Sequence, residues 1–276
     1  MSQHNSDSIA FIGGGNMARS LVGGLVARGH APTAIRVAEP VEPLRAALAA
    51  DFGVGVFSDG AEAVEGAGTW VLATKPQVLR QVCESLAHVA QRGRPLVVSI
   101  AAGITAAQLE RWLGGDVPVV RAMPNTPALL GAGVTGLFAS GSVDAAGRAL
   151  AERLLAAAGD TVWIDDEALM DAVTAVSGSG PAYVFLLAEA MTAAAIAEGL
   201  PDGAARTLAL QTIAGAARML TESGVDAAEL RRRVTSPNGT TQAALDTFEA
   251  GGFRALVANA IHAARLRGAE LAATND

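Results

Sequence analysis

The sequence predicts an α/β fold in which a doubly wound, mainly parallel sheet is followed by an all-helical domain. The chain opens with a short apolar run, a glycine turn and a helical pattern that ends at Gly29. Apolar strand-like runs then alternate with helical patterns as far as Ile164. Only helical patterns follow, to Leu271. Alternation of this kind is typical of a parallel sheet covered by helices on both faces.

The strands are placed by apolar runs between turn residues, and most of the helices between them by helical patterns. The expected strands lie at residues 8–12, 34–38, 54–56, 69–73, 96–100, 117–123, 133–139 and 161–164. The expected helices of this part lie near residues 61–64, 78–91, 105–113 and 143–158. The segment Pro40 to Pro43 is interpreted as a turn, with no helix assigned after it.

An acidic helix start at Asp165 to Glu167 marks the expected domain boundary. We therefore expect an α/β domain over residues 1–165 and an all-helical domain over residues 166–276. The helical domain is expected to contain helices at residues 202–222, 227–234, 240–250 and 253–271.

Composition limits the class of protein. The 276 residues are 51% hydrophobic and 17% charged, with a formal net charge of −7. Nucleic acid and anionic membranes both attract basic surfaces, so neither is expected as the main partner. The single cysteine, Cys83, excludes an intramolecular disulfide and fits a reducing compartment. The polar start MSQHNSDS, expected to be a loose tail, does not resemble a signal peptide, so we expect a cytoplasmic protein.

The residues Ala182 to Ala197 predict a helix that is apolar on all faces. Apart from one threonine and Glu189, every residue in this range is apolar. Such a helix must be buried all round. It is too short, and carries Glu189 too near its middle, for a membrane span of roughly 20 residues. Ser177 or Ser179 is expected to cap it, with Pro181 at the first helical position.

The glycine turn after the first strand predicts dinucleotide binding. Gly13, Gly15 and Ala18 match the spacing GxGxxG/A. In a Rossmann fold the first glycine allows a tight turn, the second lets the backbone approach a pyrophosphate, and the third small residue allows close helix packing. A flexible turn alone would explain the glycines. The strand before them and the helix after them favour a nucleotide site.

The second strand ends at Glu39, which lies 21 positions after Ala18. A carboxylate there can accept hydrogen bonds from a ribose hydroxyl, which favours NADH and repels the extra phosphate of NADPH. A solvated acid before a turn is the equally acceptable alternative. Arg36 and Arg45 are near enough in sequence to soften the repulsion, so the nucleotide preference stays open.

Turn segments follow three further strands, at Thr74 to Pro76, Ala101 to Gly103 and Pro124 to Pro127. Ligands of parallel sheets lie beyond the carboxyl ends of the strands, so these segments are expected to form the rim of the nucleotide site. Good turn sequences are the alternative. Lys75 is the only lysine among 20 lysines and arginines, which indicates a position where a compact ammonium is required.

The segment Thr235 to Thr241, TSPNGTT, forms a turn before a helix. Free amides at that helix start can hold a carboxylate, although the residues alone favour an ordinary threonine-capped helix. Arg231 to Arg233 are interpreted as a solvated or ion-paired face. The four histidines are scattered without ligand spacing, so no metal site is expected.

Six motifs together resemble one enzyme family, the pyrroline-5-carboxylate reductases. They span Phe11–Ala18, Lys75–Pro76, Ser99–Gly103, Arg121–Pro127, Ser177–Tyr183 and Ser236–Thr241. The resemblance implies reduction of Δ1-pyrroline-5-carboxylate to L-proline by hydride from NADPH or NADH. It also implies a homodimer interlocked through the helical domains, which would cover the apolar helix, and some members stack such dimers into decamers.

The resemblance assigns roles by position. The cofactor would be bound by Ile12, Gly13, Gly14, Gly15, Asn16, Met17, Glu39, Ala73, Thr74, Lys75, Pro76, Ala101 and Ala102. The substrate carboxylate would be bound by the amides of Gly239, Thr240 and Thr241. Thr241 would also be the catalytic residue, because its hydroxyl would address the ring nitrogen.

Two departures from the family pattern affect these expectations. Asn238 stands where the family usually has a glycine, so we expect a left-handed asparagine. Glu39 is acidic where many relatives are neutral, which questions a preference for NADPH. The alternatives are a reductase of another cyclic imine and a non-catalytic nicotinamide sensor. A β-hydroxyacid dehydrogenase would need a lysine in the helical domain, and none follows Lys75.

Overall fold

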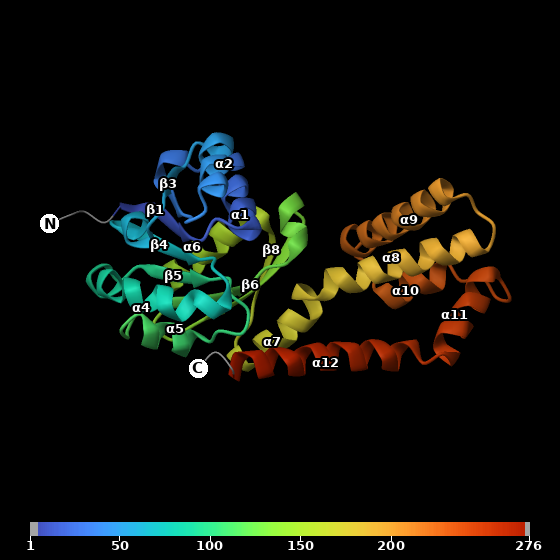
Figure 1. Ribbon diagram of the computed structural model, residues 1–276. Helices are drawn as coiled ribbons and strands as arrows, with labels where there is room; N and C mark the ends of the chain where they lie inside the picture. Colours follow the sequence, from blue (N-terminus) through green and yellow to red (C-terminus); the bar gives the residue numbers. More distant parts are fainter. Residues whose placement is uncertain (1–4, 274–276) are drawn as a thin grey trace. The chain divides into compact units, whose positions relative to one another are not determined.

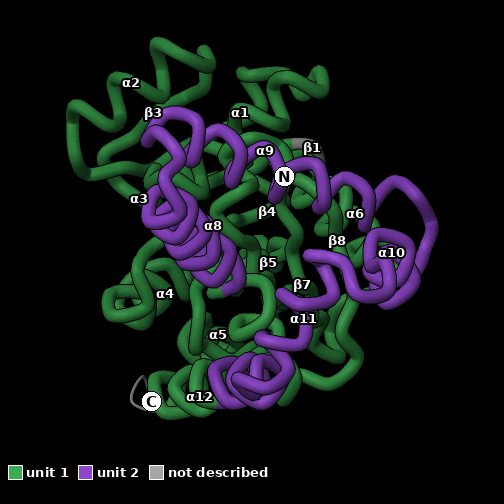
Figure 2. The backbone as a smooth tube through the Cα atoms, turned by 90° about the vertical axis from the view of Figure 1, so that its right-hand side faces the viewer, with its two compact units in different colours: residues 1–179, 263–276 green, residues 180–262 purple. Residues whose placement is uncertain are grey.

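The computed structural model describes residues 5–273, which fall into two compact units (Figure 2). The first unit lies within residues 1–179 and 263–276, and the second comprises residues 180–262. The final helix begins in the second unit and ends in the first. The predicted division after residue 165 stays a prediction, because this grouping rests on compactness alone.

The first unit contains a mainly parallel eight-stranded sheet in the order β3-β2-β1-β4-β5-β6-β7-β8 (Figure 1). Every neighbouring pair is parallel except β6 with β7. The strands are β1 (Asn5–Ile12), β2 (Ile35–Ala38), β3 (Gly55–Phe57), β4 (Ala67–Leu72), β5 (Leu96–Ser99), β6 (Val119–Met123), β7 (Gly133–Ala139) and β8 (Gly159–Trp163). All eight predicted strands are thus confirmed, with their ends displaced by at most three residues.

The first strand is longer than predicted. β1 begins at Asn5, so residues 5–7 belong to the sheet and not to a loose tail. Asn5 pairs with Ala67 of β4, and the register shifts between Asn5 and Ile9. The rest of the predicted tail, residues 1–4, lies outside the described residues, as does His4.

Helices cover both faces of this sheet. They are α1 (Asn16–Ala27), η1 (Pro32–Ala34), α2 (Glu42–Phe52), α3 (Gly60–Val64), α4 (Pro76–Gly93), α5 (Ala106–Trp112), η2 (Thr126–Leu130), α6 (Ala145–Leu155) and η3 (Ala156–Ala158). The interpretation of Pro40 to Pro43 as a turn without a helix is wrong, because α2 begins at Glu42. Pro43 is tolerated there because the first turn of a helix has no use for its missing amide hydrogen.

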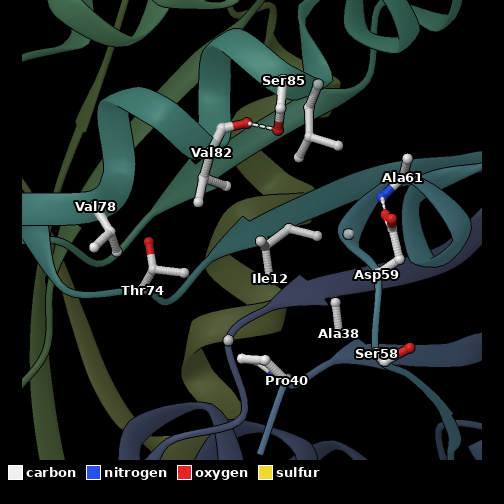
Figure 3. A pocket seen from close by; sticks show the side chains of 13 residues that line it. Ile12, Ala38, Pro40, Ser58, Asp59, Ala61, Thr74, Val78, Val82 and Ser85 are labelled. Atoms are coloured by element: carbon white, nitrogen blue, oxygen red, sulfur yellow. Dashed lines mark hydrogen bonds between the residues drawn. The ribbon is translucent and has the colours of Figure 1, made fainter.

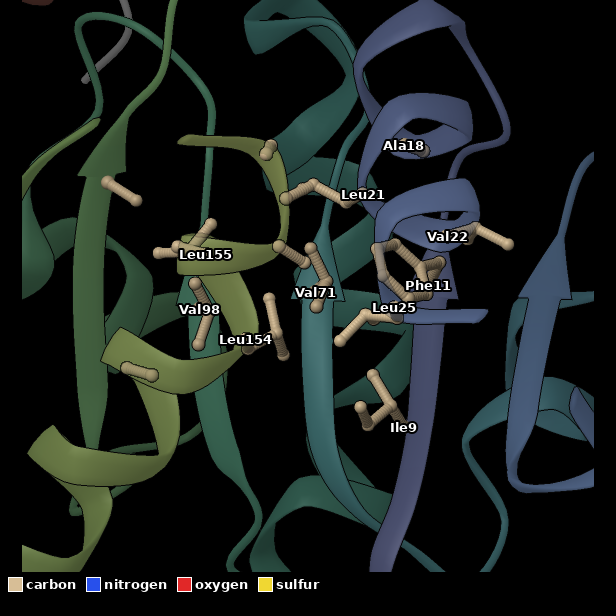
Figure 4. Packing of buried hydrophobic residues seen from close by; sticks show 14 of the residues in the cluster. Ile9, Phe11, Ala18, Leu21, Val22, Leu25, Val71, Val98, Leu154 and Leu155 are labelled. Atoms are coloured by element: carbon tan, nitrogen blue, oxygen red, sulfur yellow. The ribbon is translucent and has the colours of Figure 1, made fainter. Parts of the chain in front are cut away.

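The core consists of two apolar layers, one on each face of the sheet. Along β1, Ile9 and Phe11 belong to one layer and Ala10 and Ile12 to the other. Figure 4 shows Phe11 packed against α1, with residues of α6 nearby. The second layer contains side chains of α3, α4 and α5. Burial of both strand faces confirms the predicted covered parallel sheet.

After the sheet, the chain is helical. The elements are η4 (Glu167–Leu169), α7 (Met170–Val173), η5 (Thr174–Gly178), α8 (Gly180–Ala197), α9 (Asp202–Glu222), α10 (Ala227–Arg233), α11 (Thr240–Ala250) and α12 (Phe253–Ala273). The predicted helices of this region are confirmed, with α9 and α11 at the expected bounds. Within the second unit α9 packs against α8.

The start of the apolar helix differs from the expectation. Ser177 does not cap it, because its hydroxyl donates to the carbonyl oxygen of Val173 at 2.9 Å within a π-helical turn. Ser179 has a helical backbone conformation, φ −85° and ψ −22°, which an N-cap residue does not have. The helical path begins earlier, where the Asp166 carboxylate accepts the Ala168 amide at 2.9 Å. That contact confirms an acidic helix start near the predicted boundary.

The other helices of the second unit do not bury α8, so the expectation of a helix that is buried all round is wrong within this unit. No residue of α8 is buried, and the side chains of Phe185 and Leu186 are 59% and 66% exposed. Among the described residues one helical stretch, Glu167–Ala197, is long and apolar enough by length and composition to cross a membrane. The same apolar pattern is also typical of a helix that is buried against another protein chain.

Candidate functional site

The glycine turn after β1 has the geometry that the sequence predicts. Gly13 has φ +103°, and its amide donates to the carbonyl oxygen of Ala38 at 2.8 Å. A Cβ atom at Gly13 would lie 2.7 Å from the carbonyl oxygen of Ala73. Both the backbone conformation and the close approach of the neighbouring strand end therefore require glycine.

The start of α1 offers free amides. Gly15 is the N-cap residue, and no side chain caps the helix. A Cβ atom built on Gly15 meets nothing within 4 Å, so the space beside this backbone is open. The amides of the first helical turn, which includes Asn16 and Met17, lack intrahelical acceptors. This arrangement fits a pyrophosphate bound at the helix N-terminus.

A cavity of about 430 Å³ lies beside the glycine turn (Figure 3). It is formed by the ends of β1 and β2, the segment before α3, and α4. Its lining residues are Ile12, Gly13, Ala38, Pro40, Ser58, Asp59, Gly60, Ala61, Thr74, Val78, Val82, Ser85 and Leu86. The Thr74 hydroxyl is buried and has no hydrogen-bond partner, which suits a ligand that would supply one.

Glu39 lies at the end of β2 and is only 7% exposed. One carboxylate oxygen, Oε2, accepts the Gly14 amide at 2.9 Å, and the other, Oε1, accepts the Val41 amide at 2.9 Å. The expectation of a merely solvated acid is therefore wrong. The side chain connects the glycine turn to the end of β2. In a Rossmann fold these two elements hold the adenosine half of a dinucleotide.

The remaining predicted cofactor residues follow β4 and β5, which lie next to each other in the sheet. Pro76 is the first residue of α4, and Lys75 is its exposed N-cap residue. Ala101 is buried, whereas Ala102 is exposed. The structure thus places all thirteen predicted cofactor residues at or after the carboxyl ends of four adjacent strands, β2, β1, β4 and β5.

Several residues that line the cavity are not predicted from the sequence. Val78, Val82, Ser85 and Leu86 come from one face of α4, and Ser58 precedes α3. The spacing of four residues between Val78 and Val82 is a helical signal, but an apolar helix face is normally interpreted as core. Only the position of α4 over the strand ends turns this face into part of a site.

The motif Arg121–Pro127 fixes local structure. Arg121 is 5% exposed, and its Nη1 donates to the Glu167 carboxylate at 3.1 Å. Asn125 accepts the Val134 amide at 3.0 Å and donates to the carbonyl oxygen of Ser177 at 3.1 Å. These contacts tie β6 to η4, and they tie the segment after β6 to β7 and to the π-helical turn η5, within the first unit.

The loop Ser236–Thr241 lies in the second unit. Asn238 has φ +56°, which confirms the predicted left-handed asparagine. Gly239 is the N-cap residue of α11 without a side-chain cap, and its own amide donates to the carbonyl oxygen of Ser236 at 3.0 Å. Thr240 and Thr241 are the first two helical residues, so the alternative of a threonine-capped helix is wrong. Free amides at this helix start suit a carboxylate.

The neighbouring arginines form ion pairs. Glu229 pairs with both Arg232 and Arg233, and the side chains of these two arginines are 72% and 58% exposed. The prediction of an ion-paired face is confirmed for these two residues. Among the described residues, no group of three or more histidine, cysteine, aspartate and glutamate side chains is arranged to hold a metal ion.

Two sequence families match this chain. Residues 167–271 match the family described as pyrroline-5-carboxylate reductase dimerisation. Residues 8–103 match the family described as NADP oxidoreductase, coenzyme F420-dependent. The first match covers the helical region and the second covers the glycine turn together with β4 and β5.

Full-length relatives are also found. A pyrroline-5-carboxylate reductase from Pseudomonas aeruginosa is 55% identical over 264 residues, which are 96% of this chain and 96% of the relative. The solved structure of a pyrroline-5-carboxylate reductase from Coxiella burnetii is 42% identical, with a TM-score of 0.93 and coverage of 97% of this chain and 99% of that chain. The Plasmodium falciparum enzyme, solved with NADP bound, is 26% identical, with a TM-score of 0.85 and coverage of 98% of this chain and 100% of that chain. The fold, the ordered motifs and these full-length relatives agree, and the chain belongs to the pyrroline-5-carboxylate reductase family.

Proposed function

We propose that this protein is an NAD(P)H-dependent oxidoreductase that reduces the C=N bond of Δ1-pyrroline-5-carboxylate to give L-proline, the last step of proline biosynthesis. The observation that carries the proposal is the 55% identity to a pyrroline-5-carboxylate reductase over 96% of both chains. The two local constellations support it, because one fits a dinucleotide and the other fits a small carboxylate.

The nucleotide would be held by the glycine turn and the neighbouring strand ends. The open space beside Gly15 and the free amides of α1 fit the pyrophosphate. Glu39 would receive a ribose hydroxyl, and residues 73–76 and 101–102 would line the nicotinamide side. When bound, the reduced nicotinamide supplies the hydride.

The substrate carboxylate would be held by the amides of Thr240 and Thr241. The amide of Gly239, which was also predicted to bind it, donates to the carbonyl oxygen of Ser236 and would have to leave that oxygen to take part. The dipole of α11 contributes up to about 2 kcal/mol where the site is partly buried, in addition to the hydrogen bonds. We assign the Thr241 hydroxyl to the ring nitrogen, where it orients the imine. A threonine hydroxyl does not titrate near neutral pH, so the proton comes from solvent or from a substrate that is already protonated.

Positioning is the main task of such a protein. Hydride transfer requires nicotinamide C4 and the imine carbon to be held within about 3.5 Å, and placement of this kind can supply roughly 7 to 11 kcal/mol of barrier reduction. The glycine turn and the Ser236–Thr241 loop must therefore come together in the working enzyme. We propose that they do so between two chains.

We further propose that the chain forms an interlocked homodimer through its helical region. An apolar groove of about 300 Å³ in the second unit supports this. It is lined by residues of α8 and α12, namely Tyr183, Leu186, Leu187, Ala190, Phe253, Leu256, Val257, Ala260 and Ile261. Burial of these exposed apolar side chains against the same surface of a second chain is favourable, because it removes apolar area from water. A measured mass distinguishes a dimer from a decamer.

Within this proposal, residues 1–165 form the nucleotide-binding domain, and residues 166–276 form the dimerisation and substrate domain. The dimerisation family begins its match at residue 167, which supports that division. We propose a cytoplasmic location, consistent with one buried cysteine. A net charge of −7 disfavours nucleic acid and anionic membranes as partners.

A direct assay tests the activity. Purified protein is mixed with pyrroline-5-carboxylate and either NADH or NADPH, and the loss of the reduced nicotinamide absorbance is followed together with proline formation. We expect turnover with at least one nucleotide. No turnover with either nucleotide would instead favour a reductase of another cyclic imine or a nicotinamide sensor, which a panel of cyclic imines then separates.

A further inference from the structure

We propose that Glu39 makes this chain select NADH over NADPH, by fixing a carboxylate where the 2′-phosphate of NADPH would have to lie. The proposal rests on the nucleotide site of the proposed function and concerns which nucleotide that site selects. One matched family is described as an NADP oxidoreductase, and one solved relative holds NADP, so the proposal sets this chain apart from both.

The first step of the argument is that the carboxylate is anchored. The side chain is buried, and its two oxygens accept different backbone amides, those of Gly14 and Val41, each at 2.9 Å. If Glu39 turned away to admit a phosphate, both amides would lose their acceptor, which is costly in a buried site. A carboxylate has about four lone-pair positions, so two bonds leave capacity for ribose hydroxyls.

The second step is the charge of the surroundings. The two chain neighbours of Glu39, Ala38 and Pro40, line the cavity, and Asp59 lines it as well (Figure 3). Asp59 is committed to the start of α3, since its Oδ1 accepts the Ala61 amide at 2.6 Å. Among the described residues that line this cavity, none is lysine or arginine. A 2′-phosphate would meet charges of its own sign.

The third step concerns the nearby arginines. Arg36 donates to the carbonyl oxygens of Glu65 and Glu62, and its guanidinium lies 4.7 Å from the centre of the Phe57 ring. Arg45 donates through Nη1 to the carbonyl oxygens of Glu39, at 2.7 Å, and Pro40, at 3.1 Å. Both Nη atoms of Arg36 and the Nη1 atom of Arg45 thus donate to backbone carbonyls, while the Nε atom of Arg36 is buried without a partner among the described residues. Arg45 thereby stabilises the backbone turn at Glu39 and Pro40.

Nucleotide binding without imine tests the proposal. The dissociation constants of NADH and NADPH are measured by titration calorimetry, and those of adenosine 5′-monophosphate and adenosine 2′,5′-bisphosphate isolate the phosphate. For the unmodified chain we expect NADPH to bind at least about tenfold more weakly than NADH. Glu39→Gln removes the charge at nearly constant shape and should narrow the ratio to within about threefold. Glu42→Gln, an exposed acid of α2, is the matched control and should keep the original ratio.

Three results overturn the proposal. One is equal or tighter binding of NADPH by the unmodified chain, a measurement that needs no variant and so survives misfolding of Glu39→Gln. Another is an unchanged ratio in a folded Glu39→Gln variant. The third is a selective loss of NADPH binding in Arg45→Ala, which would assign the 2′-phosphate to that arginine. Failure of imine turnover with intact nucleotide selectivity would contradict the proposed function and leave this inference standing.

Discussion

Thr241 stands in the first turn of α11, where its hydroxyl and its amide serve different ends of the proposed substrate. Thr241→Ala keeps the amide and removes the hydroxyl. We expect turnover to fall about 10- to 1000-fold, as for loss of a group in the lower part of the acid–base range. Steady-state kinetics with pyrroline-5-carboxylate measures this.

The control for Thr241 lies further along the same helix. Thr247 is exposed, and its hydroxyl donates to the carbonyl oxygen of Ala243 at 2.9 Å. Thr247→Ala should leave turnover unchanged. A Thr241→Ala enzyme as fast as this control would remove Thr241 from the mechanism.

Substitutions at Gly13 and Gly29 distinguish backbone strain from steric contact as reasons why a position requires glycine. Both have positive φ, but only at Gly13 would a Cβ atom meet backbone atoms, whereas Gly29 has open space. Gly29→Ala should cost about 1–2 kcal/mol of unfolding free energy from the left-handed strain alone. Gly13→Ala should cost more and should also abolish nucleotide binding. Urea unfolding and NADH titration test this. If both variants lost the same unfolding free energy, the close approach of Ala73 to Gly13 would not contribute to the cost.

Cys83 should be unreactive in the folded protein. Burial raises the pKa of its thiol from 9.0 to about 12, with the nearby Glu84 carboxylate adding to the shift. The thiolate is the reactive form, so a disulfide reagent at pH 8 should label no thiol until denaturant is added. Labelling of the native chain at the rate of a free thiol would contradict the burial.

The same shift gives a stability trend of defined sign. A raised pKa means that the unfolded chain loses its proton first as pH rises. The contribution of Cys83 is therefore complete below pH 9 and is lost above it, by about 1.4 kcal/mol per pH unit until the folded thiol also titrates. Cys83→Ala removes this contribution to the pH dependence. The free energies of unfolding of the unmodified chain and of the variant, measured by urea unfolding at several pH values, should therefore approach each other above pH 9.

At the scale of whole elements, the strands were predictable and the surroundings of α8 were not. Each strand shows itself as an apolar run because both faces are buried by the chain's own helices. The apolar pattern of α8 equally indicates burial, but the pattern alone does not say which chain buries the helix. Only the family resemblance assigns that role to a second chain. Its exposed Phe185 and Leu186 show that the other helices of the second unit do not bury α8.

The nucleotide site divides in the same way. The positive φ of Gly13 follows from a local motif, and the left-handed Asn238 follows from comparison with a family pattern. The bond from the Gly14 amide to Glu39 depends on the parallel pairing of β1 with β2, which brings Gly14 beside the end of β2, whereas the bond from the Val41 amide is local. The α4 face with Val78 and Val82 became part of the site only through packing. Sequence patterns predict such local conformations better than contacts between distant residues.

The exposed face of α8 leads to a prediction about assembly. Leu186→Glu places a charge on a side chain that is 66% exposed in one chain and that lines the apolar groove. We expect dissociation of the dimer, since a buried unpaired charge is costly at an interface. Light scattering after size exclusion measures the mass. Leu44→Glu, on α2 and 48% exposed, is the matched control and should not dissociate.

At the scale of the whole molecule, the proposed reaction needs two constellations that belong to different compact units. If the glycine turn of one chain works with the Thr241 loop of its twin, two inactive variants can rescue each other. Gly15→Ala should weaken nucleotide binding, because its added methyl occupies the open space beside the turn. Thr241→Ala disables the imine side. In a mixed dimer, one site carries both changes and the other carries none.

Co-expression of the two variants with different tags therefore decides how the site is built. Random pairing makes about half of the dimers mixed, and half of the sites in a mixed dimer are intact, so about a quarter of the unmodified activity should return. Mixed dimers isolated through both tags should show about half. If each site lay within a single chain, every site in a mixed dimer would carry one defect, and the activity would stay at the level of the separate variants. That outcome would contradict the shared site while leaving the assignment of Thr241 intact.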